Sequence, residues 1–448
     1  MVFNSSFFNS SKYQDFFPVF FFVLKWILIC LVVGTMAGSA SALFLFSLHW
    51  AENIREKNFW IITLLPVAGL VIGLMYHYLG KKVEGGNNII IEQIQNPKER
   101  IQLRMTPLVL IGTVVTHLFG GSAGREGTAV QMGGSLADQL CRFFKIRPRD
   151  RKILLICGIS AGFSSVFGTP IAGAIFGLEV CIIGRLRYEA LVPAFFSAII
   201  ADYITILWGA NHTHYTVPEL FLINPGNILY AIGAGIAFGV CARVFILTLH
   251  YFSQLFKKIQ FPPLRPVAGG VVVASAVFLL GTTKYIGLGI PVIEQSFTEQ
   301  LSAYDFILKL ILTAITLGAA FKGGEVTPLF FIGATLGNAL SYIIPMPIAL
   351  LAAMGFVAVF AGAANTPIAC MLMGFELFGI QAGVYISIAC VVSYIFSGHS
   401  GIYHSQIIGS SKHLFFGKEK RMRLKNIEEY RRGKMLRNKV DNQSIKNL

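Results

Sequence analysis

The sequence predicts an all-α polytopic membrane protein, and three observations support this fold class. Of the 448 residues, 54% are hydrophobic and only 13% are charged, about half the charged share of an average soluble domain. Apolar stretches long enough to cross about 30 Å of hydrocarbon recur along almost the whole chain. A sequence repeat also divides the chain into two similar halves. Together these observations favour one large membrane domain over two or three soluble domains.

The apolar stretches predict the membrane spans in chain order. Spanning stretches lie near 17–48, 59–79, 105–120, 189–208, 227–250, 265–281, 304–321 and 382–397. Others, near 129–140, 152–167 and 329–345, are shorter or are interrupted by Gly and Pro. Unpaired backbone at membrane depth is tolerated only inside protein or beside a water-filled cavity. The interrupted stretches therefore predict broken helices around a site. The first 17 residues lack the pattern of a cleaved signal peptide, so we expect the first span to stay.

The net charge of +15 is concentrated in two segments. Residues 418–448 hold eleven Lys and Arg against four Asp and Glu, and residues 142–152 hold six against one. Lys and Arg gather on the cytoplasmic side of membrane proteins, so we expect both segments in the cytoplasm. The charge is therefore explained by topology, and we expect no nucleic-acid partner.

The seven cysteines lie mostly within apolar stretches and lack the paired spacing of a metal site. Buried cysteine behaves as a small hydrophobic residue. We therefore expect no disulfide, no metal and no cofactor.

An internal repeat organises the chain. Residues 169–179 (TPIAGAIFGLE) match residues 366–376 (TPIACMLMGFE) at six of eleven positions. The triplet Ile-Glu-Gln occurs at 91–93 and at 293–295, and a Gly-rich pattern at 124–133 recurs at 324–333. Duplicated halves with Gly- and Pro-interrupted segments predict a transporter whose substrate lies near the membrane midplane. The candidate site is then formed by 85–89, 124–128 and 324–328.

The chemistry of these segments favours an anion. A helix that begins inside the membrane presents free backbone N–H groups and the positive end of its dipole. Arg125 and Glu126 are the ionisable residues of the 118–135 segment. A lone intramembrane carboxylate is costly and predicts a function. The alternative is a structural ion pair with Arg125, which adjacent residues on a helix do not favour.

The other ionisable residues in the repeats are weaker candidates. Glu179 and Glu376 end matching apolar helices, where a capping or packing carboxylate is the expected role, and Glu92 and Glu294 are also expected to be structural. For Glu325, an ion pair with Lys322 is as plausible as a role in conduction.

At these residues the chain resembles the CLC family of chloride channels and proton-coupled anion antiporters, over roughly residues 20–410. The family signature Gly-Arg-Glu-Gly-Pro is similar to residues 124–128 (GREGT), and Gly-x-Phe-x-Pro is similar to 324–328 (GEVTP). Gly-Ser-Gly-Ile-Pro falls on 86–90 (GNNII), and the late pore tyrosine matches Tyr403. The resemblance implies a CLC-type fold of two inverted-topology repeats with many tilted and broken helices. It also implies a homodimer with one pore per subunit.

The resemblance assigns roles to individual residues. Glu126 is implied to be the gating and proton-carrying glutamate. The implied anion-binding residues are Asn87, Gly124, Arg125, Gly127, Thr128, Val326, Thr327 and Tyr403. The alignment near Asn87 is uncertain by one residue, so Asn88 is an alternative for that role.

The departures from the chloride-type motifs resemble the fluoride-exporting branch of the family. That branch carries Met or Asn in place of the signature Ser, as Asn87 does here, and Thr in place of Pro, as Thr128 does. It also carries Val-Thr before the last Pro, as Val326 and Thr327 do. The inner proton glutamate of chloride/proton antiporters is replaced here by Val180. The fluoride branch also lacks that glutamate. The resemblance therefore implies exchange of fluoride for a proton.

Several alternatives remain open from the sequence. A chloride channel or chloride/proton exchanger of the same fold is the main one, with chloride in place of fluoride. A membrane-embedded enzyme would need a nucleophile or metal cluster, which we do not find, and a sensor would use the basic tail. We expect a transport domain over 1–417, with repeats at about 20–208 and 226–410, and a basic cytoplasmic tail over 418–448. We expect the protein in the plasma membrane, as in the inner membrane of a bacterium.

Overall fold

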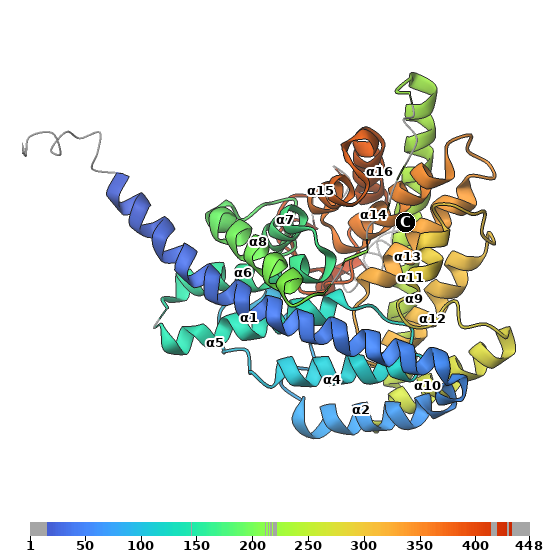
Figure 1. The fold of residues 1–448 in the computed structure, drawn as a ribbon, viewed down its shortest axis with the longest axis horizontal. Helices are drawn as coiled ribbons and strands as arrows, with labels where there is room; N and C mark the ends of the chain where they lie inside the picture. Colours follow the sequence, from blue (N-terminus) through green and yellow to red (C-terminus); the bar gives the residue numbers. More distant parts are fainter. Residues whose placement is uncertain are drawn as a thin grey trace, which may run out of the picture.

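The computed structural model describes residues 16–144, 146–210, 212–213, 215, 217, 222–413, 419–427 and 430–431, and this part of the chain is almost entirely helical (Figure 1). The first half contains α1 (Phe16–Lys57), η2 (Phe59–Leu64), α2 (Leu65–Leu79), α3 (Asn87–Gln95), α4 (Met105–Leu118), α5 (Glu126–Phe143), α6 (Pro148–Phe167), α7 (Pro170–Glu179), η3 (Tyr188–Ala190) and α8 (Leu191–Leu207). The second half contains α9 (Pro225–Lys257), α10 (Leu264–Leu280), α11 (Ile290–Gln295), α12 (Asp305–Gly318), α13 (Val326–Leu340), α14 (Ile348–Ala364), α15 (Pro367–Phe378), η4 (Ile380–Ala382) and α16 (Gly383–Phe396).

Each predicted spanning stretch coincides with a helix, and the interrupted stretches correspond to α5, α6 and α13. The prediction missed α14, which lies between two of the stretches. All of its residues except Ile348 are buried, because it packs in the centre of the protein against α13 and α16. The stretch is apolar on all sides, as expected for a helix surrounded by protein.

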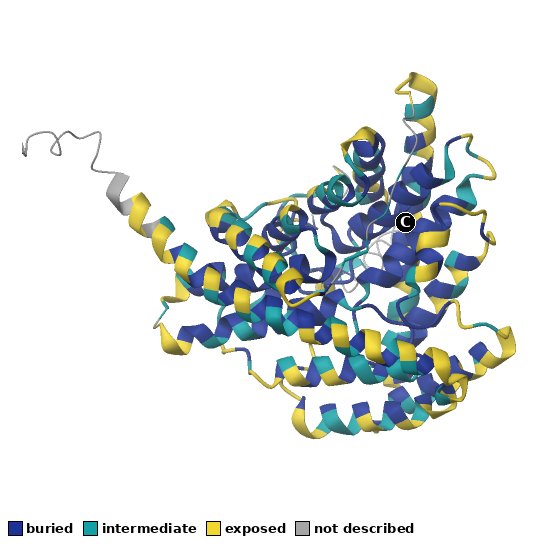
Figure 2. Cartoon of the chain, in the orientation of Figure 1, coloured by how far each residue is buried: buried dark blue, intermediate teal, exposed yellow. Residues whose placement is uncertain are grey.

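The outer helices expose apolar side chains. Four described helical stretches are long and apolar enough to cross a membrane: Val19–Lys57, Phe59–Leu79, Tyr188–Leu207 and Pro225–Lys257. Their exposed residues include many large hydrophobic side chains, and Figure 2 shows exposed positions on the outer surfaces and buried positions in the middle. An outward apolar surface of this extent is expected of a protein surrounded by lipid. Examples are Leu28, Leu43, Val71, Ile199, Leu229 and Leu247.

The sequence repeat is present in the order of the helices. The elements from α4 to α8 have counterparts in the same order from α12 to α16, with η3 matched by η4. The two halves meet where their repeated motifs touch. Gly124 and Gly324 form an antiparallel bridge, in which each N–H donates to the carbonyl oxygen of the other at 2.6 and 2.7 Å.

Glycines allow close packing at matching positions in the two halves. A methyl group at Gly133 of α5 would lie 2.2 Å from the carbonyl oxygen of Gly158 on α6. In the second half, a methyl group at Gly333 of α13 would lie 2.0 Å from the carbonyl oxygen of Gly355 on α14. Helix pairs in membranes commonly approach through small residues in this way.

Two glutamates cap helices across the halves. Glu179 at the end of α7 accepts hydrogen bonds from the backbone N–H groups of Ile368 and Ala369, at the start of α15. Glu376 on α15 accepts hydrogen bonds from Ile171 and Ala172, at the start of α7. The predicted capping role of both glutamates is confirmed, and each carboxylate satisfies N–H groups that a helix start leaves free.

The packed part of the chain continues past residue 417, the boundary expected from the sequence. Leu424 and Ile427 are buried and pack with Ile183 of β1 (Ile182–Ile183) and Ile408 of β2 (Ile407–Ile408), two short parallel strands. Lys425 forms an ion pair with Glu92 at 3.0 Å. Most of the predicted tail, including 432–448, lies outside the described residues.

The basic segments lie together at one side of the molecule. Lys25 of α1 pairs with Asp150 of the 142–152 segment at 2.7 Å, and Arg151 donates to Gln93 at 3.5 Å. Since Gln93 is next to Glu92, which binds the 419–427 segment, these parts share one side, which we call the basic side. Glu52 lies near the other end of the long helix α1, so we call its surroundings the far side.

Candidate functional site

The two Gly-rich motifs place two helix starts in the middle of the protein. The chain between α4 and α5 turns at Gly120, whose φ is +89°, and the chain between α12 and α13 turns at Ala320, whose φ is +73°. Glycine adopts a positive φ without strain, whereas alanine in this conformation is strained. The turn at Ala320 must therefore be stabilised by the residues packed around it. After the Gly124–Gly324 bridge, α5 begins at Glu126 and α13 at Val326. Both helices direct free N–H groups toward the same region.

Glu126 is fully buried, and its carboxylate is held by Thr327. The Oε2 atom accepts hydrogen bonds from the backbone N–H of Thr327 at 3.0 Å and of Arg125 at 3.1 Å. The Oε1 atom accepts a short hydrogen bond from the Thr327 hydroxyl. The carboxylate therefore lies at the start of α13, where free N–H groups and the helix dipole favour a negative charge.

Arg125 also contacts Glu126, which differs from the expectation for neighbours on a helix. Its Nε atom lies 3.6 Å from Oε1 of Glu126. Arg125 is the N-cap residue, immediately before the first residue of α5. The Arg125 Nε makes no hydrogen bond with any described residue. The ion pair thus exists, but the stronger hydrogen bonds to Glu126 come from Thr327.

Two connected spaces lead from the far side to Glu126. A small space of about 20 Å³, which we call the Arg125 pocket, is lined by Arg125, Glu126, Thr327 and Tyr215 among others. A larger cavity of about 360 Å³, the Glu52 cavity, is lined by His49, Glu52 and Arg125. Arg125, Thr213 and Ile290 line both spaces, so the two are adjacent. The Arg125 pocket has room for about one water-sized species.

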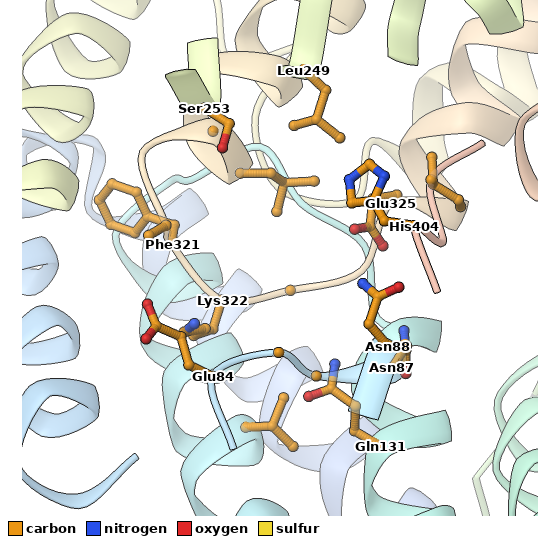
Figure 3. Close-up of a pocket in the computed structure, with 18 of the residues that line it drawn as sticks. Glu84, Asn87, Asn88, Gln131, Leu249, Ser253, Phe321, Lys322, Glu325 and His404 are labelled. Atoms are coloured by element: carbon orange, nitrogen blue, oxygen red, sulfur yellow. The ribbon is translucent and has the colours of Figure 1, made fainter. Parts of the chain in front are cut away.

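A third cavity opens on the basic side. This Asn87 cavity has a volume of about 320 Å³. Figure 3 shows Asn87, Asn88 and Glu325 along one side of it and Lys322 and Glu84 along the other. Tyr403 also lines it, and the predicted site residues Asn87 and Tyr403 thus face the same space.

The contacts of Asn87 and Asn88 differ. The Oδ1 atom of Asn88 accepts a hydrogen bond from the backbone N–H of Ser405 at 2.9 Å. The Oδ1 atom of Asn87 is buried and has no partner among the residues that the structure describes. This oxygen is an acceptor, so only the Nδ2 group of Asn87 could donate to an anion. Because the Asn88 oxygen is committed to Ser405, Asn87 is the better candidate of the two.

Glu325 does not pair with Lys322 in the described part of the chain. The Nζ atom of Lys322 lies 3.8 Å from the centre of the Tyr76 ring, a cation–π contact. Glu325 lines the Asn87 cavity together with Tyr403. Of the two sequence-based alternatives for Glu325, the ion pair with Lys322 is therefore wrong.

Gly127 lies between the two sides of the site. A methyl group there would lie 3.0 Å from Cα of Gly324, 3.2 Å from Nδ2 of Asn87 and 3.7 Å from Oε2 of Glu325. The glycine therefore brings the start of α5 close to the start of α3 and to the Asn87 cavity. Glu126 lines the Arg125 pocket on the far side and does not line the Asn87 cavity. The segment that carries the Glu126 carboxylate therefore separates these two spaces.

Two predicted anion-binding residues do not present their side chains to these spaces. The Thr128 hydroxyl lies 2.7 Å from the Thr113 hydroxyl of α4, and both are fully buried. Val326 is 1% exposed and lines neither the Arg125 pocket nor the Asn87 cavity. At these positions only the backbone N–H groups can serve an anion.

The structure adds a cluster of ionisable residues that the sequence analysis did not single out. Glu52 and Arg55 of α1 lie near His117 of α4, and Lys309 of α12 is fully buried beside them. Lys309 donates to the carbonyl oxygens of Tyr285 and Gly287. The signal was present, since His117 and Lys309 interrupt the predicted spans 105–120 and 304–321. In the described residues, no group of His, Cys, Asp and Glu side chains is arranged to hold a metal ion.

Comparisons with known proteins agree on one family. A family model described as voltage-gated chloride channel matches residues 68–398. A protein of Pseudomonas syringae pv. tomato, named a chloride/fluoride channel protein, is 52% identical over 413 residues, which cover 91% of this chain and 91% of that protein. Among solved structures, the chain is similar to a CLC-type fluoride/proton antiporter, with a TM-score of 0.84 and 34% identity over 86% of this chain and 98% of that chain.

A second solved structure shows the fold alone. It is a slow cyanobacterial Cl⁻/H⁺ antiporter, with a TM-score of 0.72 and 20% identity over 83% of this chain and 94% of that chain.

Proposed function

The chain belongs to the voltage-gated chloride channel (CLC) family, and on this premise we propose that it exports fluoride in exchange for protons, with Glu126 as gate and proton carrier. Two relatives support fluoride as the anion. The relative with 52% identity is named a chloride/fluoride channel protein, and the solved structure with 34% identity is a fluoride/proton antiporter. Membership of a family of channels and transporters sets the enzyme alternative aside.

The observation that carries the proposal is the contact between Glu126 and Thr327. The carboxylate takes one N–H and one hydroxyl hydrogen bond at the start of α13. These donors suit a small anion equally well, so a carboxylate and an anion compete for them. When Glu126 takes up a proton, its negative charge is lost and its hold on these donors weakens. An anion can then replace it, which couples the two ions.

Fluoride fits the donors and the space at this site. Fluoride is small and strongly hydrated, so a protein that removes its water must supply hydrogen-bond donors in return. The Thr327 hydroxyl, the Asn87 amide and the backbone N–H groups of α5 and α13 are such donors. The Arg125 pocket, at about 20 Å³, is close to the size of one water molecule.

Proton movement drives the export in this proposal. Protons enter from outside down their gradient and reach Glu126, and fluoride leaves the cytoplasm through the Asn87 cavity. Val180 stands where chloride/proton antiporters of the family carry an inner glutamate. Glu126 therefore carries the proton without that partner.

Reconstituted liposomes test the proposal directly. Vesicles loaded with fluoride or chloride are compared, and anion efflux is recorded together with proton uptake. We expect fluoride efflux with stoichiometric proton uptake and slow chloride efflux. In Glu126→Gln we expect proton uptake to disappear, because the amide cannot carry a proton. Chloride efflux as fast as fluoride efflux favours the chloride transporter of the same fold, and coupled flux in Glu126→Gln contradicts the assigned role.

We further propose how the protein lies in the membrane. The basic side faces the cytoplasm, because it carries the 142–152 and 419–427 segments, and the far side faces outward. The antiparallel Gly124–Gly324 bridge supports an inverted relation between the halves, because each glycine makes the same contact with the other. We also propose a homodimer with one pore per subunit, in keeping with the family resemblance.

A further inference from the structure

His117 is a buried titratable residue without a hydrogen-bond role for its ring. The side chain is fully buried at the end of α4. Neither ring nitrogen makes a hydrogen bond of normal geometry with a described residue, and the polar backbone group set against the ring is that of Gly124. Buried polar atoms in proteins almost always have good partners, so an imidazole this poorly satisfied requires an explanation. The backbone carbonyl oxygen of His117 accepts a hydrogen bond from Arg55 at 2.6 Å, but this bond does not involve the ring.

Glu52 connects this ring to the far side of the protein. Its Oε1 atom lies 3.9 Å from Nδ1 of His117. Glu52 lines the Glu52 cavity, and it also lines a neighbouring cavity of about 370 Å³ together with Arg55 and Lys284. Its side chain is 21% exposed, whereas that of His117 is 0% exposed. The pair therefore joins a solvent-reachable carboxylate to a fully buried imidazole.

The ring is also close to the segment that holds Glu126. The backbone of Gly124 lies against the imidazole. A methyl group at Gly124 would lie 3.0 Å from Oε2 of Glu126. His117 and Glu126 are therefore both neighbours of Gly124, and His117 does not line the Arg125 pocket.

We propose that Glu52 and His117 carry protons between the far-side cavities and Glu126. The inference rests on the proposed proton exchange and adds two residues to it. It gives the proton a path of its own, so that an anion in the Arg125 pocket does not block the proton on its way to the carboxylate. An imidazole suits the task because one nitrogen can accept a proton while the other releases one.

The transfer balances in protons and charge. In the proposed transfer, the protonated carboxyl of Glu52 gives its proton to Nδ1 of His117, while Nε2 releases a proton that passes along the Gly124 segment to the carboxylate of Glu126. Glu52 becomes a carboxylate, Glu126 becomes neutral, and His117 changes from one neutral tautomer to the other. Rotation of the ring restores the first tautomer before the next proton arrives.

The charges around the ring favour this concerted form. Arg55, Lys309 and Arg125 are the cations that act on His117, and Glu52 is the carboxylate nearest to it in the described cluster. Three cations oppose a free imidazolium, so a path through the neutral ring costs less than a stepwise path. The same cations attract the negative charge that Glu52 acquires when it releases its proton.

The cluster also stabilises local structure, but the imidazole ring does not take part. Arg55 binds the carbonyl oxygen of His117, and Lys309 binds the carbonyl oxygens of Tyr285 and Gly287. These contacts hold α1 against α4 and the 282–289 segment against α12. Replacement of the His117 ring leaves all of these hydrogen bonds in place. A variant at this position therefore tests the role of the ring alone.

The test uses the full-length protein in liposomes, with fluoride efflux and proton uptake recorded at several external pH values. The variants are Glu52→Gln, His117→Gln and the double variant, and His49→Gln is the matched control, because His49 lines the same cavity but is exposed. Size-exclusion profiles and thermal unfolding establish that each variant is folded. Externally added imidazole is tested on His117→Ala, whose missing ring leaves space for it.

We expect both single variants to transport about tenfold more slowly at alkaline external pH, where protons are scarce, and less so at acidic external pH. The double variant should be no slower than the slower single variant, and imidazole should restore part of the rate of His117→Ala. Wild-type rates at all external pH values overturn the relay. An equal loss at every external pH without rescue by imidazole also overturns it, because a structural defect behaves in this way.

The outcome for the relay is separate from that for the proposed function. If Glu126→Gln removes proton uptake while the relay variants behave as wild type, only the relay is wrong. If the wild-type protein shows no proton uptake with fluoride, the proposed exchange itself is wrong.

Discussion

Thr327 donates two hydrogen bonds to the carboxylate of Glu126, one from its backbone N–H at 3.0 Å and one from its hydroxyl. The two residues are 201 positions apart and belong to corresponding helix starts of the two halves. The second half thus holds the carboxylate of the first. In the proposed exchange, the strength of this contact sets how readily an anion replaces the carboxylate.

Replacement of Thr327 by Val should weaken anion binding. Val keeps the branched shape and removes the hydroxyl, and a hydrogen bond to a charged group contributes about 1.5 to 3 kcal/mol. We expect the KM for fluoride in liposome efflux to rise by about tenfold or more, since 1.4 kcal/mol corresponds to a factor of ten. Thr327→Ser keeps the hydroxyl and is the control. A KM in Thr327→Val equal to that of the wild type would show that the hydroxyl does not contact the anion.

Replacement of Gly324 by Ala should disrupt the crossing of the two motifs. The added methyl group would lie 2.7 Å from the backbone nitrogen of Gly127, and backbone cannot move aside cheaply. We expect a loss of about 1 to 3 kcal/mol in stability and a loss of transport. Gly233→Ala is the matched control, because nothing lies within 4 Å of that position and Ala favours a helix. Thermal unfolding in detergent measures both, and equal melting temperatures would contradict the predicted clash.

Asn87 and Asn88 should differ when each is replaced by Ala. Asn87 lines the Asn87 cavity, where its Nδ2 group can donate to an anion, and its amide oxygen holds no described residue, so its loss should change the ratio of fluoride to chloride flux with little change in stability. Asn88 binds the backbone of Ser405, so its loss should lower the melting temperature, by about 1 kcal/mol in stability. Selectivity and melting are measured on the same preparations. A selectivity change confined to Asn88→Ala would reverse the assignment.

Truncation of the chain should have an effect that depends on where it ends. A chain that ends after residue 417 loses Leu424 and Ile427, which are buried, and the ion pairs of Arg423 and Lys425 with Glu92. Burial of two such side chains contributes about 3 kcal/mol or more. A chain that ends after residue 431 keeps these contacts. We expect the shorter chain alone to melt earlier and transport poorly, and equal behaviour of both chains would show that the packing is dispensable.

The contacts of Glu419 should make the C-terminal packing sensitive to acid. Burial raises the pKa of this carboxyl, but the hydrogen bonds from Arg431 and His399 outweigh burial and hold its pKa below the ordinary value. The stabilisation is therefore complete above about pH 4.3 and is lost as the pH falls through the lower pKa of the folded protein. Glu419→Gln should lower the melting temperature at neutral pH, and the difference should vanish in strong acid. A difference that persists there would exclude the carboxylate as its cause.

Much of the fold follows from the sequence because lipid imposes a simple requirement. Every span must be apolar and must satisfy its own backbone hydrogen bonds, so the stretches that became α1, α2, α8 and α9 were predictable from composition. The stretch that forms α14 is apolar throughout, so its existence as a helix was readable from composition although the prediction missed it. Composition does not encode its central place, packed against α13 and α16.

The candidate site was predicted less completely. The Gly-rich motifs located Glu126 and Thr327, since an intramembrane carboxylate beside glycines is rare enough to stand out. Their direct contact was not predictable, because it depends on how two helix starts meet across the halves. The same reason applies to Glu52 and His117, which are 65 residues apart in the sequence and become neighbours only through the packing of α1 on α4.

The sequence by itself determined that this is a helical membrane protein of two repeated halves, and it pointed to the glycine motifs as the candidate site. Periodicity, composition and local motifs carry that information because they act within one helix or one turn. The tertiary structure alone decided that the Glu126 carboxylate contacts Thr327, that the Thr128 hydroxyl contacts Thr113, and that the Asn87 amide oxygen has no partner among the described residues. These relations depend on the angle and depth at which helices cross, and side chains from distant parts of the chain meet only when that packing is complete.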